Sequence, residues 1–199
     1  MAMAPTLTGT LDRLLGRSRT YLDEAAFSAL YDRTYLIVFR YVYGLCGGPA
    51  QDVEDITAET YLRAWRARES FTGDGEAATG WLLQIARRLV IDAYRRRSTR
   101  PDGDEAPPEF VAAPDAGPEE EAQAREQWRV LWQLLVDLPP DQREMLVLRY
   151  MLGWRVNRIA HHFGLAENTV SVTIRRVLGR LRKAWPKEER VVKIMERVS

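Results

Sequence analysis

Apolar positions recur at helical spacing through the first hundred residues of the chain. Between residues 27 and 45 the stripe comprises Phe27, Leu30, Tyr31, Thr34, Val38, Tyr41, Val42 and Leu45. This spacing predicts an amphipathic helix, and Gly47-Gly48-Pro49 should end it. A second helix is predicted from about Asp52, and its expected buried stripe is Ala58, Tyr61, Leu62 and Trp65.

A third helix is predicted to begin at Trp81, after a loop at residues 70–80 that is rich in glycine and short side chains. Its expected core stripe is Leu82, Ile85, Ala86, Leu89 and Ala93. The opposite face carries Gln84, Arg87, Arg88, Ile91, Tyr94 and Arg95, and Arg96 and Arg97 extend its charge. Arginines interleaved with Trp81 and Tyr94 suit single-stranded DNA, because cations follow the backbone while aromatic rings stack on unpaired bases. A purely structural Trp81 remains the alternative.

The last third of the chain predicts two short helices that cross at a tight turn. Ala160 would let the two backbones approach, Gly164 would make the turn, and Val170 would fill the crossing. This pattern is typical of a helix-turn-helix, whose second helix enters the major groove of DNA. An ordinary helical hairpin needs the same small and apolar residues and remains the alternative.

The second of these helices has an apolar stripe and a cationic face. The stripe comprises Val170, Ile174, Val177, Leu178 and Leu181. The far side carries Asn168, Val172, Arg175, Arg176 and Lys183, flanked by Ser171 and Arg182. No acid occurs from Thr169 to Lys183. Because guanidinium and amide groups read base edges and bind phosphates, this face is predicted to bind duplex DNA.

Charge divides the chain unevenly. The whole chain has a net charge of +1, but residues 98–122 hold eight acids against Arg100 alone. That segment therefore carries −7 and the remainder +8. It also holds five of the ten prolines and few large apolar residues, so we expect an extended acidic, proline-rich linker between two basic modules. A merely solubilising loop is the alternative interpretation.

Composition argues against several other classes of protein. Cys46 is the only cysteine, which excludes an intrachain disulfide and a cysteine-rich zinc site. His161 and His162 are adjacent and cannot form an i, i+4 metal pair, and no phosphate loop or nucleophile elbow occurs. We therefore expect no metal, no cofactor and no enzymatic activity. Neither a signal peptide nor an apolar run of about 20 residues occurs, so we expect a cytoplasmic protein without membrane insertion.

Short motifs follow one another in both halves of the chain. The first half contains Asp52-Val53-Glu54-Asp55-Ile56-Thr57-Ala58-Glu59-Thr60-Tyr61-Leu62-Arg63-Ala64-Trp65, Phe71-Thr72-Gly73-Asp74 and Asp92-Ala93-Tyr94-Arg95-Arg96-Arg97. The second half contains Leu138-Pro139, Leu148-Arg149-Tyr150, Ile159-Ala160, Thr169-Val170 and Arg180-Leu181-Arg182. In this order and spacing, the chain from about Phe27 to Trp185 resembles the bacterial RNA polymerase sigma factors of the extracytoplasmic-function (ECF) group.

The resemblance implies an all-α fold of two small helical domains, a region 2-like bundle and a region 4-like helix-turn-helix. The implied division is an N-terminal extension at 1–24, the region 2-like domain at 25–97, the acidic linker at 98–122, the region 4-like domain at 123–185 and a tail at 186–199. It also implies an alternative, stress- or signal-responsive factor that gives core RNA polymerase its promoter specificity and melts promoter DNA. An anti-sigma factor is a further candidate partner.

The resemblance assigns three sets of binding residues. Core polymerase would contact Asp52, Asp55, Glu59, Arg63 and Arg66. The melted single strand of the minus-ten element would contact Trp81, Gln84, Arg87, Arg88, Ile91, Tyr94, Arg95, Arg96 and Arg97. The duplex minus-thirty-five element would contact Arg155, Arg158, Asn168, Ser171, Val172, Arg175, Arg176, Arg182 and Lys183.

Two alternatives bear on these assignments. The acids of the second predicted helix could form a solvated edge, with Glu59 paired to Arg63 at i+4, instead of a docking face for a basic partner. A two-module helix-turn-helix regulator that does not act through core polymerase could share the second half of the chain. Such a regulator would normally carry a sensor fold with strands in its first half, and no strand pattern is seen before Ser98.

Overall fold

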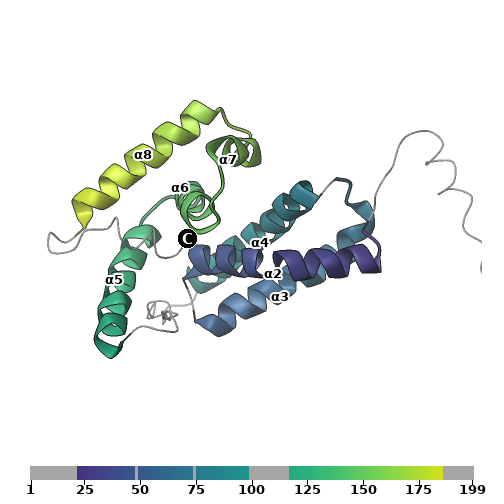
Figure 1. Cartoon of the computed structure of the whole chain (residues 1–199), viewed down its shortest axis with the longest axis horizontal. Helices are drawn as coiled ribbons and strands as arrows, with labels where there is room; N and C mark the ends of the chain where they lie inside the picture. The colour runs from purple at the N-terminus through teal and green to yellow at the C-terminus, as the bar shows by residue number, and fades with distance from the viewer. Residues whose placement is uncertain (1–21, 48, 74, 99–116, 186–199) are drawn as a thin grey trace, which may run out of the picture.

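The computed structural model describes residues 22–47, 49–73, 75–98 and 117–185, and these ranges form helices without any strand (Figure 1). The first module contains α2 (Glu24–Cys46), α3 (Ala50–Ala67), the short 3-10 helix η1 (Arg68–Ser70) and α4 (Gly75–Ser98). The second contains α5 (Pro118–Val136), α6 (Pro140–Leu146), the π-helical turn η2 (Val147–Met151), α7 (Val156–Phe163) and α8 (Glu167–Ala184). The predicted all-α class and the two-module architecture are confirmed.

The first module is a three-helix bundle in which α2, α3 and α4 pack against one another (Figure 1). The Asp23 side chain caps α2 by accepting a hydrogen bond from the Ala26 amide at 2.8 Å. Val38, Val53 and Leu82 supply side chains from the three helices to the buried centre. Burial of these apolar stripes is the main stabilisation of such a bundle.

The buried stripe predicted for α3 is partly wrong. The helix buries Val53, Thr57, Thr60, Tyr61 and Ala64, whereas Ala58 is exposed and Leu62 is 51% exposed. Threonines occupy two inward positions, and the Thr60 hydroxyl donates to the Ile56 carbonyl at 2.7 Å. A hydroxyl satisfied within its own helix can be buried at little cost, so apolar spacing alone selected the wrong face.

The predicted start of the third helix is also wrong, because α4 begins at Gly75 and not at Trp81. Thr79 donates its hydroxyl hydrogen to the Gly75 carbonyl at 3.0 Å, inside the first turns of the helix. The glycine and short side chains that suggested a loop therefore form a helical turn. Leu82, Ala86 and Leu89 are buried as predicted, whereas Ile85 and Ala93 are only half-buried.

The second module contains the predicted helix-turn-helix, in which α7 and α8 meet at Gly164. This glycine has a φ of 65°, a left-handed conformation that favours glycine at the end of a helix. Ile159 and Ala160 of α7 are buried, as are Val170 and Ile174 of α8. The small residue and the apolar plugs therefore occupy the crossing, as the sequence indicated.

The ends of the predicted linker differ from the structure. Ser98 is the last residue of α4, and α5 begins at Pro118, inside the segment predicted to be extended. Proline is favourable at the first position of a helix, where its missing N–H costs nothing. Residues 99–116 lie outside the described ranges, as do the tail at 186–199 and residues 1–21 of the N-terminal extension.

The two modules pack against each other at the C-terminal half of α2, which α6 and η2 contact (Figure 1). Gly44 of α2 permits this approach. A Cβ atom at this position would lie 2.5 Å from Met151 Sδ and 2.9 Å from Val147 Cγ2. Tyr43 also stacks on Trp128 of α5, with ring centroids 5.4 Å apart.

A buried carboxylate lies at the centre of this contact. Glu144 of α6 is 1% exposed and accepts a hydrogen bond from the Tyr41 hydroxyl at 2.7 Å. Its second oxygen accepts from Arg87 Nε of α4 at 2.6 Å. His162 Nε2 of α7 lies 2.9 Å from the first oxygen. These residues, called the Glu144 cluster below, join α2 and α4 of the first module to α6 and α7 of the second.

A second buried cation continues the contact next to the Glu144 cluster. Arg143 is 7% exposed and donates from Nη1 to the Leu45 carbonyl at 3.1 Å and to the Tyr94 hydroxyl at 2.9 Å. Its Nη2 donates to the Val136 carbonyl at 2.7 Å. Arg143 therefore satisfies carbonyl groups near the C-terminal ends of α2 and α5, where the helices leave such groups without partners.

The protonation of Glu144 depends on its partners. Burial would raise the pKa of the carboxyl, but the hydrogen bonds with His162 and Tyr41 and the charge of Arg87 outweigh it. The pKa of Glu144 is thus held below its ordinary value of 4.5. Burial and the neighbouring carboxylate raise the pKa of the Tyr41 hydroxyl well above its ordinary value of 10.0. Glu144 is therefore a carboxylate and Tyr41 a neutral donor at neutral pH.

We expect acid to weaken the folded chain partly through Glu144. Because folding lowers its pKa, the carboxylate stabilises fully above about pH 4.5 and loses that contribution as the pH falls through the lower folded value. The urea midpoint, followed by circular dichroism from about pH 6 to about pH 3, should therefore fall more steeply in the wild type than in Glu144→Gln. The control Glu54→Gln, at an exposed position of α3, should keep the wild-type slope. Parallel profiles for wild type and Glu144→Gln would contradict this role.

Candidate protein-binding and nucleic-acid-binding surfaces

The outward face of α3 brings together the five residues assigned to core polymerase. Asp55, Arg63 and Arg66 are exposed, whereas Asp52 and Glu59 are half-buried. Arg63 Nε donates to Glu59 Oε1 at 2.8 Å, which is the predicted i, i+4 pair. Asp55 accepts a hydrogen bond from the Gln51 side chain at 3.1 Å. The face thus mixes carboxylates and guanidinium groups along one side of the helix.

Leu62 is the residue of this face that the sequence analysis missed. It had been assigned to the core, but its side chain is 51% exposed in the middle of the α3 face. On the neighbouring helix, Tyr31 and Tyr35 are 41% and 37% exposed, and their ring centroids lie 4.7 and 6.4 Å from that of Tyr61. Tyr31 had been placed in the buried stripe from its helical spacing, whereas Tyr35 had not been assigned. Exposed apolar side chains therefore occur on α2 as well as on the charged face of α3.

The outward side of α4 carries most of the residues assigned to the minus-ten element. Gln84, Arg88, Arg95 and Arg96 are exposed, and Ile91 is half-buried. Trp81 is half-buried and lies over Phe71, with ring centroids 4.8 Å apart and an interplanar angle of 31°. The aromatic pair therefore has one partly open side beside a row of cations. Arg97 belongs to α4, but its side chain lies outside the described set.

Arg87 and Tyr94 do not lie on that open side, although the sequence placed them with the cationic face. Arg87 is paired with Glu144 and with Asp141 of α6. The Tyr94 hydroxyl accepts a hydrogen bond from Arg143. The second module thus engages two of the nine residues assigned to the minus-ten element. Helical periodicity could not reveal this, because the partners are about fifty residues away in sequence.

The α8 face gathers the residues assigned to the minus-thirty-five element. Asn168, Arg175, Arg176, Arg182 and Lys183 are exposed, and Ser171 and Val172 are half-buried. Ahead of the turn, Arg155 is exposed, and the guanidinium of Arg158 lies 4.0 Å from the centroid of the Trp154 ring.

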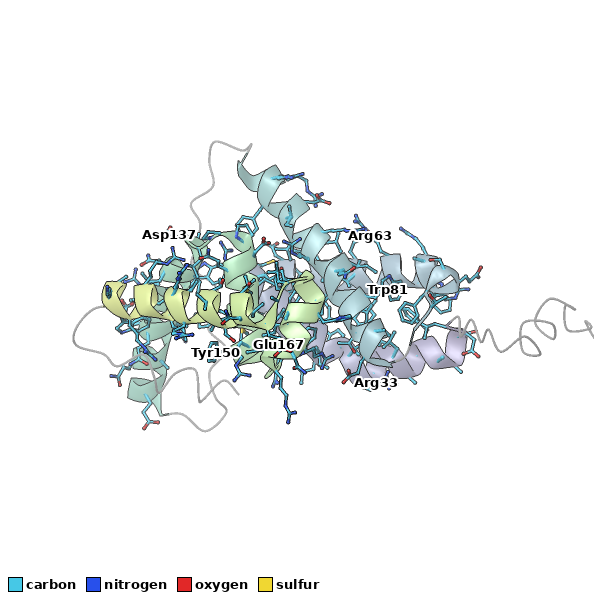
Figure 2. The ribbon with its side chains drawn as sticks, turned by 90° about the horizontal axis from the view of Figure 1, so that it is seen from above. Arg33, Arg63, Trp81, Asp137, Tyr150 and Glu167 are labelled. Carbon is cyan, nitrogen blue, oxygen red and sulfur yellow. The ribbon has the colours of Figure 1, made fainter. Side chains whose placement is uncertain are left out.

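Figure 2 shows Arg63 and Trp81 on the first module and Tyr150 and Glu167 on the second. The proposed reading surfaces therefore lie on different modules.

An open groove of about 280 Å³ follows α8 on one side of this face. Its polar lining comprises Arg149, Tyr150, Ser171, Arg175 and Arg182, and its apolar lining comprises Val156, Ile174 and Leu178. Three guanidinium groups without an acid in the lining favour an anion such as a backbone phosphate. Arg149 is partly fixed, since its Nη1 donates to the Trp154 carbonyl at 2.9 Å. The sequence analysis did not assign Arg149 or Tyr150 to DNA.

The described ranges contain neither a candidate metal site nor a candidate membrane span. No group of three or more His, Cys, Asp or Glu side chains in these ranges is arranged to hold a metal ion. No helix in the same ranges is both long and apolar enough to cross a membrane.

Comparison with known protein families matches both modules. The family model for sigma-70 region 2 matches residues 30–100, and the model for sigma-70 region 4 matches residues 128–181. The first match contains α3 and α4, and the second contains α6, α7 and most of α8. The surfaces described above thus fall within two regions of the sigma-70 family.

Named relatives match most of the chain. It is 32% identical over 148 residues to the ECF RNA polymerase sigma factor SigL of Mycobacterium tuberculosis. The aligned segment covers 74% of this chain and 82% of SigL. It is 31% identical over 173 residues to the ECF RNA polymerase sigma factor BldN of Streptomyces coelicolor. This aligned segment covers 86% of this chain and 65% of BldN. Both identities extend across the two modules.

Solved structures show the same fold. The sigma factor RpoE of Bartonella quintana, in complex with the anti-sigma factor NepR, superposes with a TM-score of 0.61 at 19% identity, covering 82% of this chain and 98% of RpoE. CnrH, in complex with the cytosolic domain of CnrY, superposes with a TM-score of 0.58 at 24% identity, covering 85% of this chain and 94% of CnrH. Together with the sequence matches, these findings show that the chain belongs to the ECF RNA polymerase sigma factor family and directs transcription initiation.

Proposed function

We propose that the α3 face binds core RNA polymerase, that the α4 face holds the melted minus-ten strand, and that the α8 face reads the minus-thirty-five duplex. The observation that carries this proposal is the separation of three chemically different surfaces on two modules of one chain. One surface is charged with an exposed leucine, one is aromatic and cationic, and one is a cationic helix-turn-helix.

The α3 face has the character of a protein-binding surface. A solvated edge explains Asp55 and the Glu59–Arg63 pair, but it does not explain why Leu62 is half exposed among them. A single exposed leucine is ordinary, but exposed Tyr31 and Tyr35 on the adjoining helix α2 add further apolar surface to the same module. Apolar side chains ringed by charged groups are typical of protein interfaces. This arrangement favours docking over the solvated-edge alternative.

The α8 face suits duplex DNA. Val170, Ile174 and Val177 anchor the helix in the module, which leaves Arg175 and Arg176 exposed on the outer side. Two adjacent guanidinium groups on a recognition helix can reach base edges and phosphates in the major groove. The groove that contains Arg149 and Arg182 would add phosphate contacts at the edge of the same face.

The α4 face suits an unpaired strand. The half-buried Trp81 ring, which rests on buried Phe71, offers an aromatic surface for stacking, and Arg88 and Arg95 provide cations along the same helix. A flipped base held against an aromatic ring offsets part of the cost of unstacking it. This combination favours a melted minus-ten strand over a duplex.

The remaining parts of the proposal concern place and partners. A factor that acts on polymerase and chromosome would work in the cytoplasm and would need no catalytic chemistry of its own. The two solved neighbours are complexes, one with a named anti-sigma factor, which supports a partner of that kind here. Run-off transcription with purified core polymerase on pooled genomic fragments is the direct test, because transcripts that depend on the added chain would reveal both activity and promoters.

Charge reversal on α3 should weaken binding to core polymerase. The double variant Asp55→Arg/Glu59→Arg should lose at least about tenfold in affinity, or ~1.4 kcal/mol, while the free chain stays helical. Exposed ion pairs contribute only about 0–1 kcal/mol to stability, so unfolding is not expected. Competition binding against labelled chain would measure the affinity.

Two further variants sharpen that test. Leu62→Ser should also weaken the polymerase complex, since it removes the exposed apolar side chain without changing charge. The matched control Glu126→Arg/Asp137→Arg places two reversals on exposed positions outside α3 and should bind as the wild type does. Unchanged affinity of both α3 variants would refute the docking assignment.

Arginine removal on α8 should separate base reading from phosphate binding. Arg175→Ala or Arg176→Ala should cost about 1–3 kcal/mol and relax preference at one promoter position if the side chain reads a base. A phosphate contact predicts instead uniform weakening and a shallower dependence on salt. Holoenzyme binding to minus-thirty-five duplexes in a salt series would distinguish these results, with Arg129→Ala on α5 as the control. If neither variant differs from the control, this face does not bind the element.

A further inference from the structure

One tryptophan supports two arginines where the helix-turn-helix begins. Trp154 belongs to the loop between η2 and α7, and the guanidinium carbon of Arg158 lies 4.0 Å from the centroid of its ring. The Trp154 carbonyl accepts a hydrogen bond from Arg149 Nη1 at 2.9 Å. We propose that Trp154 is a positioning residue for duplex binding, which orders these two cations before DNA arrives. This inference rests on the proposed function of the second module, because it takes both arginines as contacts to the DNA backbone.

The Trp154 ring is a rigid support. The residue is only 6% exposed, and its backbone N–H donates to the Leu148 carbonyl at 2.9 Å. The ring meets His162 edge to face, with ring centroids 5.7 Å apart and an interplanar angle of 85°. His162 is held in turn by Glu144, because its Nε2 lies 2.9 Å from a carboxylate oxygen. A guanidinium that stacks on this ring therefore has a fixed support.

This support leaves the charge of Arg158 available. No carboxylate of the described residues pairs with Arg158. Arg68 also stacks on a tryptophan, 3.9 Å from the Trp65 ring centroid, but it pairs with Glu69 at 3.3 Å as well. A carboxylate neutralises a guanidinium and occupies N–H groups that a phosphate needs, whereas the face of a ring attracts the cation without accepting those bonds. Trp154 therefore holds a cation that DNA can still bind.

Ordering in the free protein lowers the cost of binding. An arginine has several rotatable bonds and loses much of that freedom when it contacts a phosphate. If the ring already restricts Arg158, less freedom remains to be lost when DNA binds. Removal of the ring leaves the charge in place, so the number of neutralised phosphates and the slope of log affinity against log salt should not change. The affinity should instead fall by the same factor at every salt concentration.

Four substitutions isolate the ring contact. Trp154→Leu keeps an apolar side chain at the buried site but removes the ring, whereas Trp154→Phe keeps a smaller ring. Arg158→Ala removes the supported cation. Arg155→Ala is the matched control, because Arg155 is an exposed cation next to Trp154 in sequence and stacks on no ring of the described residues. A role that acts through Arg158 couples Trp154 to that residue alone, whereas a general loosening of α7 does not distinguish the two arginines.

The test measures binding of the holoenzyme to a minus-thirty-five duplex over a series of salt concentrations. Trp154→Leu should bind about 3- to 10-fold more weakly than the wild type at each concentration, with the wild-type slope. Arg158→Ala should also bind more weakly, and its slope should be shallower by about 0.9. Trp154→Leu should add almost nothing in the Arg158→Ala background but should keep its full effect in the Arg155→Ala background. Trp154→Phe should lie between the wild type and Trp154→Leu.

Nitrogen NMR relaxation of the free full-length chain tests the ordering itself. In the wild type, the order parameter of the Arg158 Nε–H group should be higher than that of Arg155, because only Arg158 rests on a ring. In Trp154→Leu it should fall to the level of Arg155. An Arg158 order parameter that Trp154→Leu leaves unchanged would overturn the inference independently of any DNA measurement.

The binding outcomes separate this inference from the proposed function. Wild-type affinity in Trp154→Leu would overturn the positioning role, and so would an equal loss from Trp154→Leu in the Arg158→Ala and Arg155→Ala backgrounds. A slope in Trp154→Leu as shallow as that of Arg158→Ala would also overturn it, since the phosphate contact itself would then be lost. Failure of the wild-type holoenzyme to bind the duplex would instead overturn the proposed function of the second module. If Trp154→Leu loses helicity, Trp154→Phe replaces it, and its loss of about twofold should be confined to backgrounds that retain Arg158.

Discussion

One buried carboxylate determines how the two halves of this sigma factor meet. Glu144 is 1% exposed, and its oxygens find partners on α2, α4 and α7. A charge removed from water must be paired, so the position of Glu144 constrains all three helices at once. Gly44 permits the close approach of Val147 and Met151, whereas the carboxylate of Glu144 determines which polar residues of the two modules pair with each other. The contacts of Arg143 and the Tyr43–Trp128 stack add to this requirement and help to fix the relative placement of the modules.

The sequence predicted well those features that depend on local spacing. The apolar stripe of α8 and the glycine turn after α7 follow directly from helical periodicity and from the left-handed conformation that Gly164 adopts. The stripe of α3 failed because Thr57 and Thr60 are buried while Leu62 is not. Apolar spacing cannot recognise an inward threonine, such as Thr60 with its hydroxyl bonded within its own helix, nor can it identify a leucine that stays exposed.

The binding surfaces also differ in how far they could be predicted from local spacing. The cations of α8 were identifiable because a recognition helix displays them on one face, without an acid from Thr169 to Lys183. The engagement of Arg87 was not identifiable, because its partner Glu144 lies 57 residues away and neither residue signals the other. The α8 face, which we propose reads duplex DNA, is therefore open, while part of the α4 face, which we propose holds the single strand, is engaged by the opposite module.

A double-mutant cycle tests the central claim most directly. It would compare wild type, Tyr41→Phe, Glu144→Gln and the combined variant in urea unfolding at neutral pH. If the Glu144 carboxylate joins the modules, the two substitutions should be non-additive by about 1–2 kcal/mol, since either one removes the charge-assisted bond: phenylalanine has no donor, and glutamine has no charge. Additive effects, with a coupling energy near zero, would show that Tyr41 and Glu144 do not interact in solution. That result would contradict the packing of the two modules through the Glu144 cluster.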